Sequence, residues 1–234
     1  MDIRAIIFDK DGTLIDFPAT FNPATDRVLA QLCGEDRELL RAAADVWDFD
    51  LVTKTVDPKS VIVSASSFEI AEALSTVIPV HDIGEFGVKL DEMFGAVCVE
   101  TVTPLPDTEA TLHTLKANRL MLGIGTNDAE ANAVAQMQTL GFLTLFDKIF
   151  GADSGHGPKP GPGMIEAFTE MCGLEPQQVL MVGDSLHDLE SGKSAGVRTC
   201  GVETGPADRI TLEKHADMVL QSIADLPGHV GLLM

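Results

Sequence analysis

The sequence predicts an α/β protein with a Rossmann-like parallel sheet core and a mostly α-helical insert after its first strand. The chain opens on an unbroken apolar run, Ala5-Ile6-Ile7-Phe8, which is typical of a strand buried on both faces. Segments with helical spacing follow up to residue 103. Beyond that point strand-like and helix-like segments alternate, which indicates parallel strands joined by right-handed crossovers.

The core is expected to comprise residues 1–16 and 104–234, and the insert residues 17–103. Pro104 and Pro106 mark the second boundary, because two closely spaced prolines cannot continue a helix. The length of 234 residues suits a core domain with one insert, since domains average roughly 150 residues.

Within the insert, apolar side chains recur at helical spacing over residues 23–50, and Pro23 is expected in the first turn of that helix. Residues 66–78 and 86–99 repeat the helical pattern, while Val61-Ile62-Val63 is too short to classify. The core is expected to alternate between helices (residues 108–118, 129–140, 162–172 and 186–195) and strands (residues 120–125, 148–150, 179–182, 197–202 and 218–220).

The composition argues against several classes of function. Sixteen Lys and Arg against 36 Asp and Glu give a net charge of −20, which repels nucleic acids and anionic membranes. The four cysteines are widely spaced, so neither a zinc clip nor a redox pair is expected. No signal peptide and no apolar run of roughly 18 residues is found. We expect a cytoplasmic protein without nucleic-acid or membrane partners; the sequence indicates no oligomeric state.

Polar residues collect where the predicted strands end. The carboxyl ends of parallel strands meet at one edge of a sheet, which is where ligands bind. The side chains expected at that edge are Asp9, Asp11, Thr126, Asn127, Lys159, Asp184 and Asp188. Clustered carboxylates stay ionised only beside a cation, and oxygen ligands favour a hard ion such as Mg²⁺. A lysine and a hydroxyl can hold phosphate oxygens, so the set favours phosphoryl transfer. A carboxylate can also be the nucleophile of such a reaction and form an aspartyl-phosphate.

Each feature alone has a simpler explanation. Asp-Gly after a strand is good turn chemistry, and Asp128 is expected to cap the helix that follows it. An EF-hand is excluded, because its sixth and twelfth positions counted from Asp9 hold Leu14 and Thr20 in place of Gly and Glu. The functional interpretation therefore depends on the joint order of these residues at consecutive strand ends.

Four segments together resemble the motifs of the haloacid dehalogenase-like hydrolases. They are Phe8-Asp9-Lys10-Asp11-Gly12-Thr13-Leu14, Gly125-Thr126-Asn127, Lys159-Pro160-Gly161-Pro162 and Gly183-Asp184-Ser185-Leu186-His187-Asp188. By its position and helical pattern, the insert resembles the helical cap that such proteins carry between the first two motifs. The overall layout looks most like that of the phosphoglycolate phosphatase-type members.

The resemblance implies a role for each residue. Asp9 would be the nucleophile, and Asp11 the general acid and then base. Thr126, Asn127 and Lys159 would bind phosphate. Mg²⁺ would be held by Asp9, Asp184 and the backbone carbonyl of Asp11, with Asp188 in its outer shell or bound through water. An Asp at position 11 implies phosphate ester chemistry, because a leaving alkoxide needs a proton.

The resemblance thus implies a Mg²⁺-dependent phosphomonoester hydrolase that acts on a small phosphorylated metabolite, phosphoglycolate or a sugar phosphate. In the insert, Lys54 and Lys59 are candidates to steer a second anionic group of the substrate, although solvated lysines are the commoner case. Two alternatives stay open. One is a phosphomutase of the β-phosphoglucomutase type, and the other is a catalytically silent binding protein with the same fold.

Overall fold

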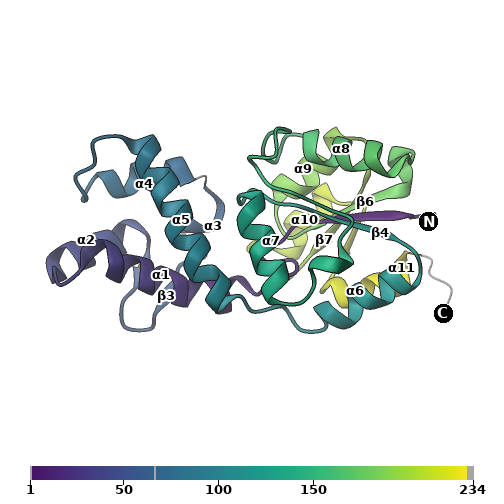
Figure 1. The fold of residues 1–234 in the computed structure, drawn as a ribbon. Coiled ribbons are helices and arrows are strands. Elements are labelled where there is room, and N and C mark those ends of the chain that lie inside the picture. The colour runs from purple at the N-terminus through teal and green to yellow at the C-terminus, as the bar shows by residue number, and fades with distance from the viewer. Residues whose placement is uncertain (1, 66, 231–234) are drawn as a thin grey trace. The chain divides into compact units, whose positions relative to one another are not determined.

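The computed structural model describes residues 2–65 and 67–230. It divides into two compact units, which are Met1–Asp16 with Thr103–Met234 and, between them in sequence, Phe17–Val102. The first unit is a parallel sheet with helices on both faces (Figure 1). The predicted α/β fold class is therefore confirmed.

The sheet has six strands in the order β5-β4-β1-β6-β7-β8, and each neighbouring pair is parallel. The strands are β1 (Ala5–Phe8), β4 (Met121–Gly125), β5 (Lys148–Phe150), β6 (Val179–Gly183), β7 (Arg198–Val202) and β8 (Met218–Leu220). The strand order reverses between β1 and β6. In open α/β sheets the ligand crevice lies at such a switch point, beyond the carboxyl ends of the strands.

Strand β1 owes its central place to its four apolar residues. All four are fully buried, because helices cover both faces of the sheet. Helices α8 (Gly163–Cys172) and α9 (Leu186–Ser194) cover one face, and α6 (Thr108–Ala117), α7 (Glu130–Thr139) and α11 (Leu226–His229) cover the other (Figure 1). The short helix α10 (Arg209–His215) connects β7 with β8 and was not expected from the sequence.

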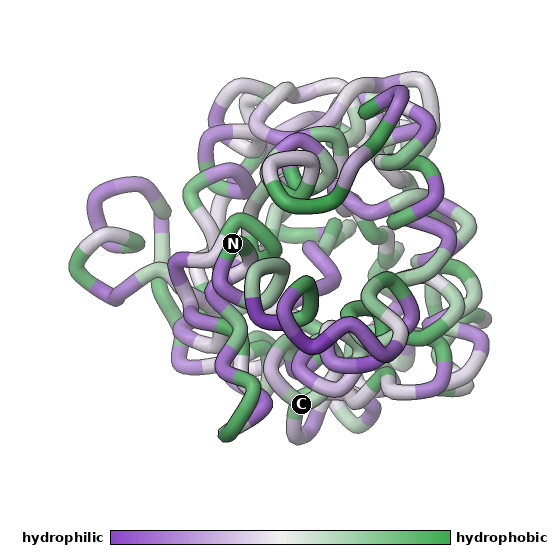
Figure 2. Tube along the Cα trace, turned by 90° about the vertical axis from the view of Figure 1, so that its left-hand side faces the viewer, coloured by the Kyte–Doolittle hydropathy of each residue, from purple (hydrophilic) through white to green (hydrophobic). Residues whose placement is uncertain are grey.

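The second unit has its own apolar core and five helices among the described residues. They are α1 (Phe17–Cys33), α2 (Arg37–Val46), α3 (Val61–Ser64), α4 (Ser67–Ser75) and α5 (Ile83–Thr101), and a small antiparallel hairpin joins β2 (Phe49–Asp50) to β3 (Thr55–Val56). Its centre is formed by fully buried residues such as Val28, Trp47 and Leu74. The tube in Figure 2 alternates between hydrophobic and hydrophilic residues along its helical turns, as amphipathic helices require.

The single helix expected over residues 23–50 is wrong. Helix α1 ends before Gly34, whose φ of 56° is left-handed, and Asp36 caps α2 by accepting bonds from the amides of Glu38 and Leu39. The start of α1 also differs, since Pro18 and not Pro23 lies in its first turn. A helical period continues through both helices, so periodicity alone did not reveal the break.

Within the described ranges, the structure contains no helix both long enough and apolar enough to cross a membrane.

Candidate active site

The first loop of the site begins where β1 ends. The amide of Asp9 still donates to the carbonyl of Val182 on β6, at 2.8 Å, so the strand pairing fixes the backbone of Asp9. The loop then turns through Gly12, whose φ is 78°. A Cβ on Gly12 would lie 2.4 Å from a carboxylate oxygen of Asp184, so glycine is needed both for the turn and for this close approach.

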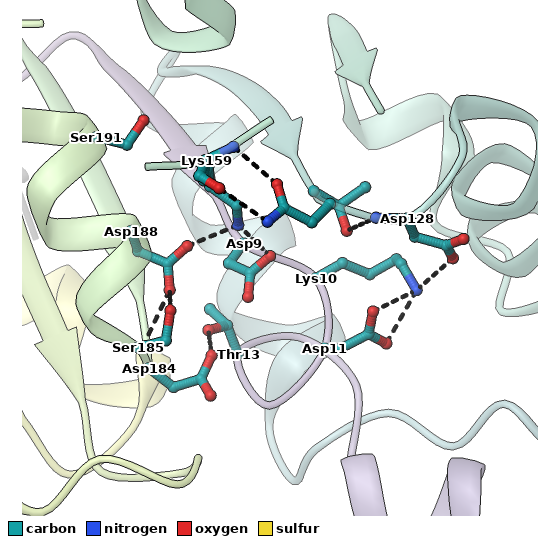
Figure 3. Close-up of polar contacts among 12 residues, drawn as sticks. Asp9, Lys10, Asp11, Thr13, Asp128, Lys159, Asp184, Ser185, Asp188 and Ser191 are labelled. Carbon is teal, nitrogen blue, oxygen red and sulfur yellow. Dashed lines mark hydrogen bonds and ion pairs between the residues drawn. The ribbon is translucent and has the colours of Figure 1, made fainter. Parts of the chain in front are cut away.

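Lys159 lies at the centre of the site, between two carboxylates (Figure 3). Its Nζ is 2.6 Å from Oδ1 of Asp9 and 2.6 Å from Oδ1 of Asp188. Burial alone would lower the pKa of this lysine, but the charges and hydrogen bonds of Asp188 and Asp9 outweigh it, and the pKa is raised. Lys159 is therefore held as an ammonium ion, placed to neutralise negative charge at Asp9.

Asp188 is fixed by the start of helix α9. Its Oδ2 accepts hydrogen bonds from the backbone amide of Ser185, at 3.0 Å, and from the Ser185 hydroxyl, at 2.7 Å. Together they form a capping box, which ties the carboxylate to the helix N-terminus. Asp188 therefore orients Lys159 from a rigid support.

Asp184 completes the group from the end of β6. Its Oδ1 accepts from the hydroxyl of Thr13 at 2.7 Å, and the backbones of Gly12 and Gly205 enclose its other oxygen. A Cβ on Gly205 would lie 1.6 Å from Oδ2 of Asp184, so this loop position also requires glycine. Burial, followed by the charges of Asp9 and Asp188, raises the pKa of Asp184 well above its usual value.

The three carboxylates have the chemistry of a site for a hard divalent cation. Asp9, Asp184 and Asp188 each offer an oxygen, and these atoms lie within 4.8 Å of one another. Burial and the charge of Asp188 raise the pKa of Asp9 to about 7 despite the ion pair with Lys159. One ammonium does not balance three carboxylates, of which two are buried and that of Asp9 is partly buried. The residues present thus fit Mg²⁺, which prefers oxygen ligands and few protein carboxylates.

Thr126 and Asn127 follow β4, where the sequence predicted phosphate ligands. The side chain of Asn127 is turned to the backbone of Lys159: it accepts from the amide at 2.8 Å and donates to the carbonyl at 3.0 Å. Thr126 is almost fully buried and accepts from the amide of Asp128 at 3.1 Å. In this structure Asn127 therefore positions Lys159, and a phosphate-binding role for either residue stays a prediction.

Asp11 lies in a second cluster, beside that of Lys159. Both of its oxygens face Nζ of Lys10, at 2.9 and 2.7 Å, and in Figure 3 its carboxylate points toward this ammonium and away from Asp9. Lys10 also contacts Asp128 at 3.1 Å and Gln136 at 2.7 Å. Burial raises the pKa of Asp11, and the charge of Lys10 opposes that rise.

Sequence reasoning missed Lys10 and Gln136, and it assigned Asp128 a different role. Asp128 does not cap α7 as an N-cap residue, since that position belongs to Ala129. Its Oδ1 instead accepts from the Ala129 amide and the Asn132 side chain, and its Oδ2 faces Lys10. The one available signal was a lysine placed two residues after a fully apolar strand, where a charge needs a buried partner.

The two candidate lysines of the insert lie in the second unit. Nζ of Lys54 is 2.6 Å from Oδ1 of Asp26, and both side chains are partly exposed. Lys59 is exposed, and its backbone amide donates to Asp57 at 2.8 Å. Their role in substrate binding stays a prediction.

Comparison with known proteins gives a consistent result. A model of the haloacid dehalogenase-like hydrolases matches residues 3–196. Phosphoglycolate phosphatase of Escherichia coli O157:H7 is 30% identical over 240 residues, which cover 99% of this chain and 94% of that protein. Two solved structures share the fold. A haloacid dehalogenase-like family protein from Streptococcus pneumoniae has a TM-score of 0.70, 19% identity and coverage of 97% of this chain and 98% of that one. A HAD phosphatase from Thermococcus onnurineus has a TM-score of 0.67, 21% identity and 98% coverage of both chains.

The family match spans most of the chain, including all four segments that carry the strand-end residues. The relative from Escherichia coli extends the similarity to nearly the full length, the helical unit included. The chain belongs to the haloacid dehalogenase-like hydrolases.

Proposed function

We propose that this protein is a Mg²⁺-dependent phosphomonoester hydrolase that works through an aspartyl-phosphate on Asp9. The observation that carries the proposal is the position of Asp9 itself. It lies at the switch point of the sheet, paired with a buried ammonium and beside two further carboxylates. This arrangement is suited to holding a phosphoryl group between positive charges and an oxygen nucleophile.

Asp9 has one oxygen available for attack. Lys159 contacts Oδ1, while Oδ2 has no hydrogen-bond partner among the residues that the structure describes. Attack by this oxygen on phosphorus forms the aspartyl-phosphate and breaks the bond to the leaving alkoxide. Lys159 offsets charge on the transferred group, and Asn127 holds the backbone that carries it.

Asp9 and Asp184, with the carbonyl of Asp11, would hold Mg²⁺, and Asp188 would support it from the outer shell. When bound, the ion offsets the charge of the carboxylates and of the phosphate dianion. Asp11 would give a proton to the leaving oxygen and then take one from the attacking water. That second step restores the Asp9 carboxylate and releases inorganic phosphate.

The proposed substrate is a small phosphorylated acid such as phosphoglycolate. The relative from Escherichia coli is named a phosphoglycolate phosphatase, and the similarity covers nearly its full length. The second unit would act as the cap that selects substrates. Lys54 and Lys59 are its proposed contacts with a substrate carboxylate. The enzyme would work in the cytoplasm, as expected for a chain with four free cysteines.

A panel of phosphate esters tests the proposal. Released phosphate is measured with Mg²⁺ and after the protein has been stripped with EDTA, for phosphoglycolate, sugar phosphates and nucleoside monophosphates. We expect turnover that chelation abolishes and Mg²⁺ restores. Full activity without metal would contradict the mechanism. A requirement for a sugar 1,6-bisphosphate would indicate a phosphomutase, and no turnover of any ester would indicate a silent binding protein.

A further inference from the structure

Lys10 is the most completely buried charge outside the group around Asp9. Its side chain is 0% exposed. Its ammonium has three N–H groups, and the described partners are Asp11, Asp128 and the amide oxygen of Gln136. The pKa of Lys10 is raised, because Asp11 and Asp128 outweigh the effect of burial. Such a charge is tolerated in a protein interior only when it is paired.

Two of these partners hold Lys10 without help from Asp11. Asp128 is fixed to the start of α7, because its Oδ1 accepts from the Ala129 amide at 2.7 Å and from Asn132 at 2.9 Å. Gln136 lies on α7 and is 1% exposed. The ammonium is thus anchored by two side chains that lie outside the first loop, at the start of α7 and within it.

Asp11 is the remaining partner, and it is bound differently. It contacts Lys10 through both oxygens, whereas no other hydrogen bond to its carboxylate is found in the described part of the chain. Its side chain is 21% exposed, while that of Lys10 is fully buried. Lys10 would keep its neutralising carboxylate, Asp128, if Asp11 turned elsewhere. The contact with Lys10 is therefore what sets the direction of the Asp11 carboxylate.

We propose that Lys10 is a positioning residue for Asp11: anchored by Asp128 and Gln136, it fixes where the carboxyl group of the proposed general acid lies. This inference rests on the proposed function of Asp11. It gives Lys10, which lies between the two first-loop aspartates, an indirect role in proton transfer that acts only through Asp11. An effect that acts through Asp11 must depend on the leaving group and must vanish when Asp11 cannot transfer a proton.

A double-mutant cycle tests this inference. Lys10→Met and Asp11→Asn are made singly and together, and kcat is measured on the fastest alkyl phosphate of the panel and on p-nitrophenyl phosphate. We expect Lys10→Met to lower kcat about tenfold on the alkyl ester but only about twofold on the nitrophenyl ester, since a good leaving group needs no proton. In the Asp11→Asn background, Lys10→Met should lower kcat about twofold or less on both esters.

Equal losses on the two esters, or equal losses in both backgrounds, would overturn the inference and show a general structural role. Gln136→Met weakens the anchor without removing a charge, so it gives a second test if Lys10→Met fails to fold. A crystal structure of either variant with Asp11 unmoved would also overturn it. Lys116→Met is the control, because that lysine pairs with Asp147 at the protein surface, outside the site. An inactive parent protein would instead refute the proposed function.

Discussion

Two buried lysines contact the two aspartates of the first loop, and their surroundings differ in one respect. Lys159 faces three carboxylates that point into a common space, and two of them contact it directly. Lys10 faces two carboxylates and an amide. In both groups one carboxylate is tied to a helix start. The first group keeps an excess of two negative charges, which a divalent cation can neutralise. The second keeps an excess of one negative charge, and Asp128 also accepts from the Ala129 amide and the Asn132 side chain.

The difference shows how the same ion-pair chemistry can serve two purposes. Around Lys159, a charge imbalance is kept where a phosphate and a metal are proposed to bind. Around Lys10, the charges are close to balanced, which suits support. A buried pair that loses one member is costly in both places, but only the first group holds the proposed nucleophile. Substitutions in the two groups should therefore have very different effects on kcat.

The largest effect is expected for Asp9→Asn. The amide has nearly the same shape as the carboxylate, but it is a poor nucleophile, so kcat should fall by about 10³-fold or more. Circular dichroism should be unchanged. Asp128→Asn is the matched change in the Lys10 group. It should lower kcat about tenfold or less, because Asp128 only holds Lys10, which in turn positions Asp11. An Asp9→Asn enzyme that kept a tenth of the parent rate would refute the assignment of the nucleophile.

The next largest loss of activity is expected for Lys159→Met, and it should exceed the loss caused by Lys10→Met. Removing the ammonium that offsets charge on the transferred phosphoryl group should lower kcat/KM by about 10²- to 10³-fold. The loss should be similar for good and poor leaving groups, since Lys159 does not act on the leaving oxygen. If the two methionine variants lost equal amounts on an alkyl phosphate, the distinction between the two lysines would be wrong.

The sequence reveals one of these groups better than the other. Lys159, Asp184 and Asp188 were predicted because each follows a recognisable strand end or motif, and the topology of a parallel sheet brings such ends together. Lys10 lies in the first of these motifs, but nothing in the sequence indicates its partners. Its partner Gln136 lies in the middle of a helix, where the sequence shows only an ordinary polar residue. Pairings of this kind depend on how α7 packs against the first loop, which local patterns do not encode.

The same limit explains the misplaced elements of the second unit. The break at Gly34 interrupts a helical period that continues in both flanking helices, so the period does not reveal it, and the left-handed backbone and the cap at Asp36 do. Asn127 shows the limit within the site, because its residue type suits a phosphate ligand equally well as a clamp on the backbone of Lys159. For Asn127, residue type predicted the place in the site, while tertiary packing decided the contact.

A smaller effect separates Asp9 from Asp11. Asp11→Asn should lower the first-step rate most for alkyl phosphates, whose leaving oxygen needs a proton, and less for p-nitrophenyl phosphate. The loss of first-step rate should be about tenfold larger for alkyl phosphates than for p-nitrophenyl phosphate. Hydrolysis of the phospho-enzyme should also slow, so that phosphorylated Asp9 accumulates. Single-turnover measurements separate the two steps, and equal first-step losses on both esters would remove the acid role from Asp11.

The smallest effect concerns stability in the absence of metal. The pKa of Asp9 is raised from its ordinary value of 3.8 to about 7 by burial and by the charge of Asp188. Between those values the folded protein holds a proton that the unfolded chain has lost. The stabilising contribution of Asp9 is therefore complete below about pH 4 and is lost as the pH rises through about 7. Asp9→Asn does not titrate and should escape this loss.

The Tm of the Asp9→Asn variant, relative to the parent in EDTA, should consequently be higher at pH 8 than at pH 5, by a few degrees. Taking the difference between the two proteins removes most contributions from other groups, which titrate in both. Mg²⁺ at pH 8 should raise the Tm of the parent more than that of the variant, because an ionised Asp9 offers the ion a stronger ligand. A Tm difference that stayed constant or fell with pH would show that Asp9 is ionised in the metal-free protein. In that case the proton that reduces the excess negative charge around Lys159 would be on Asp184, whose pKa is also raised.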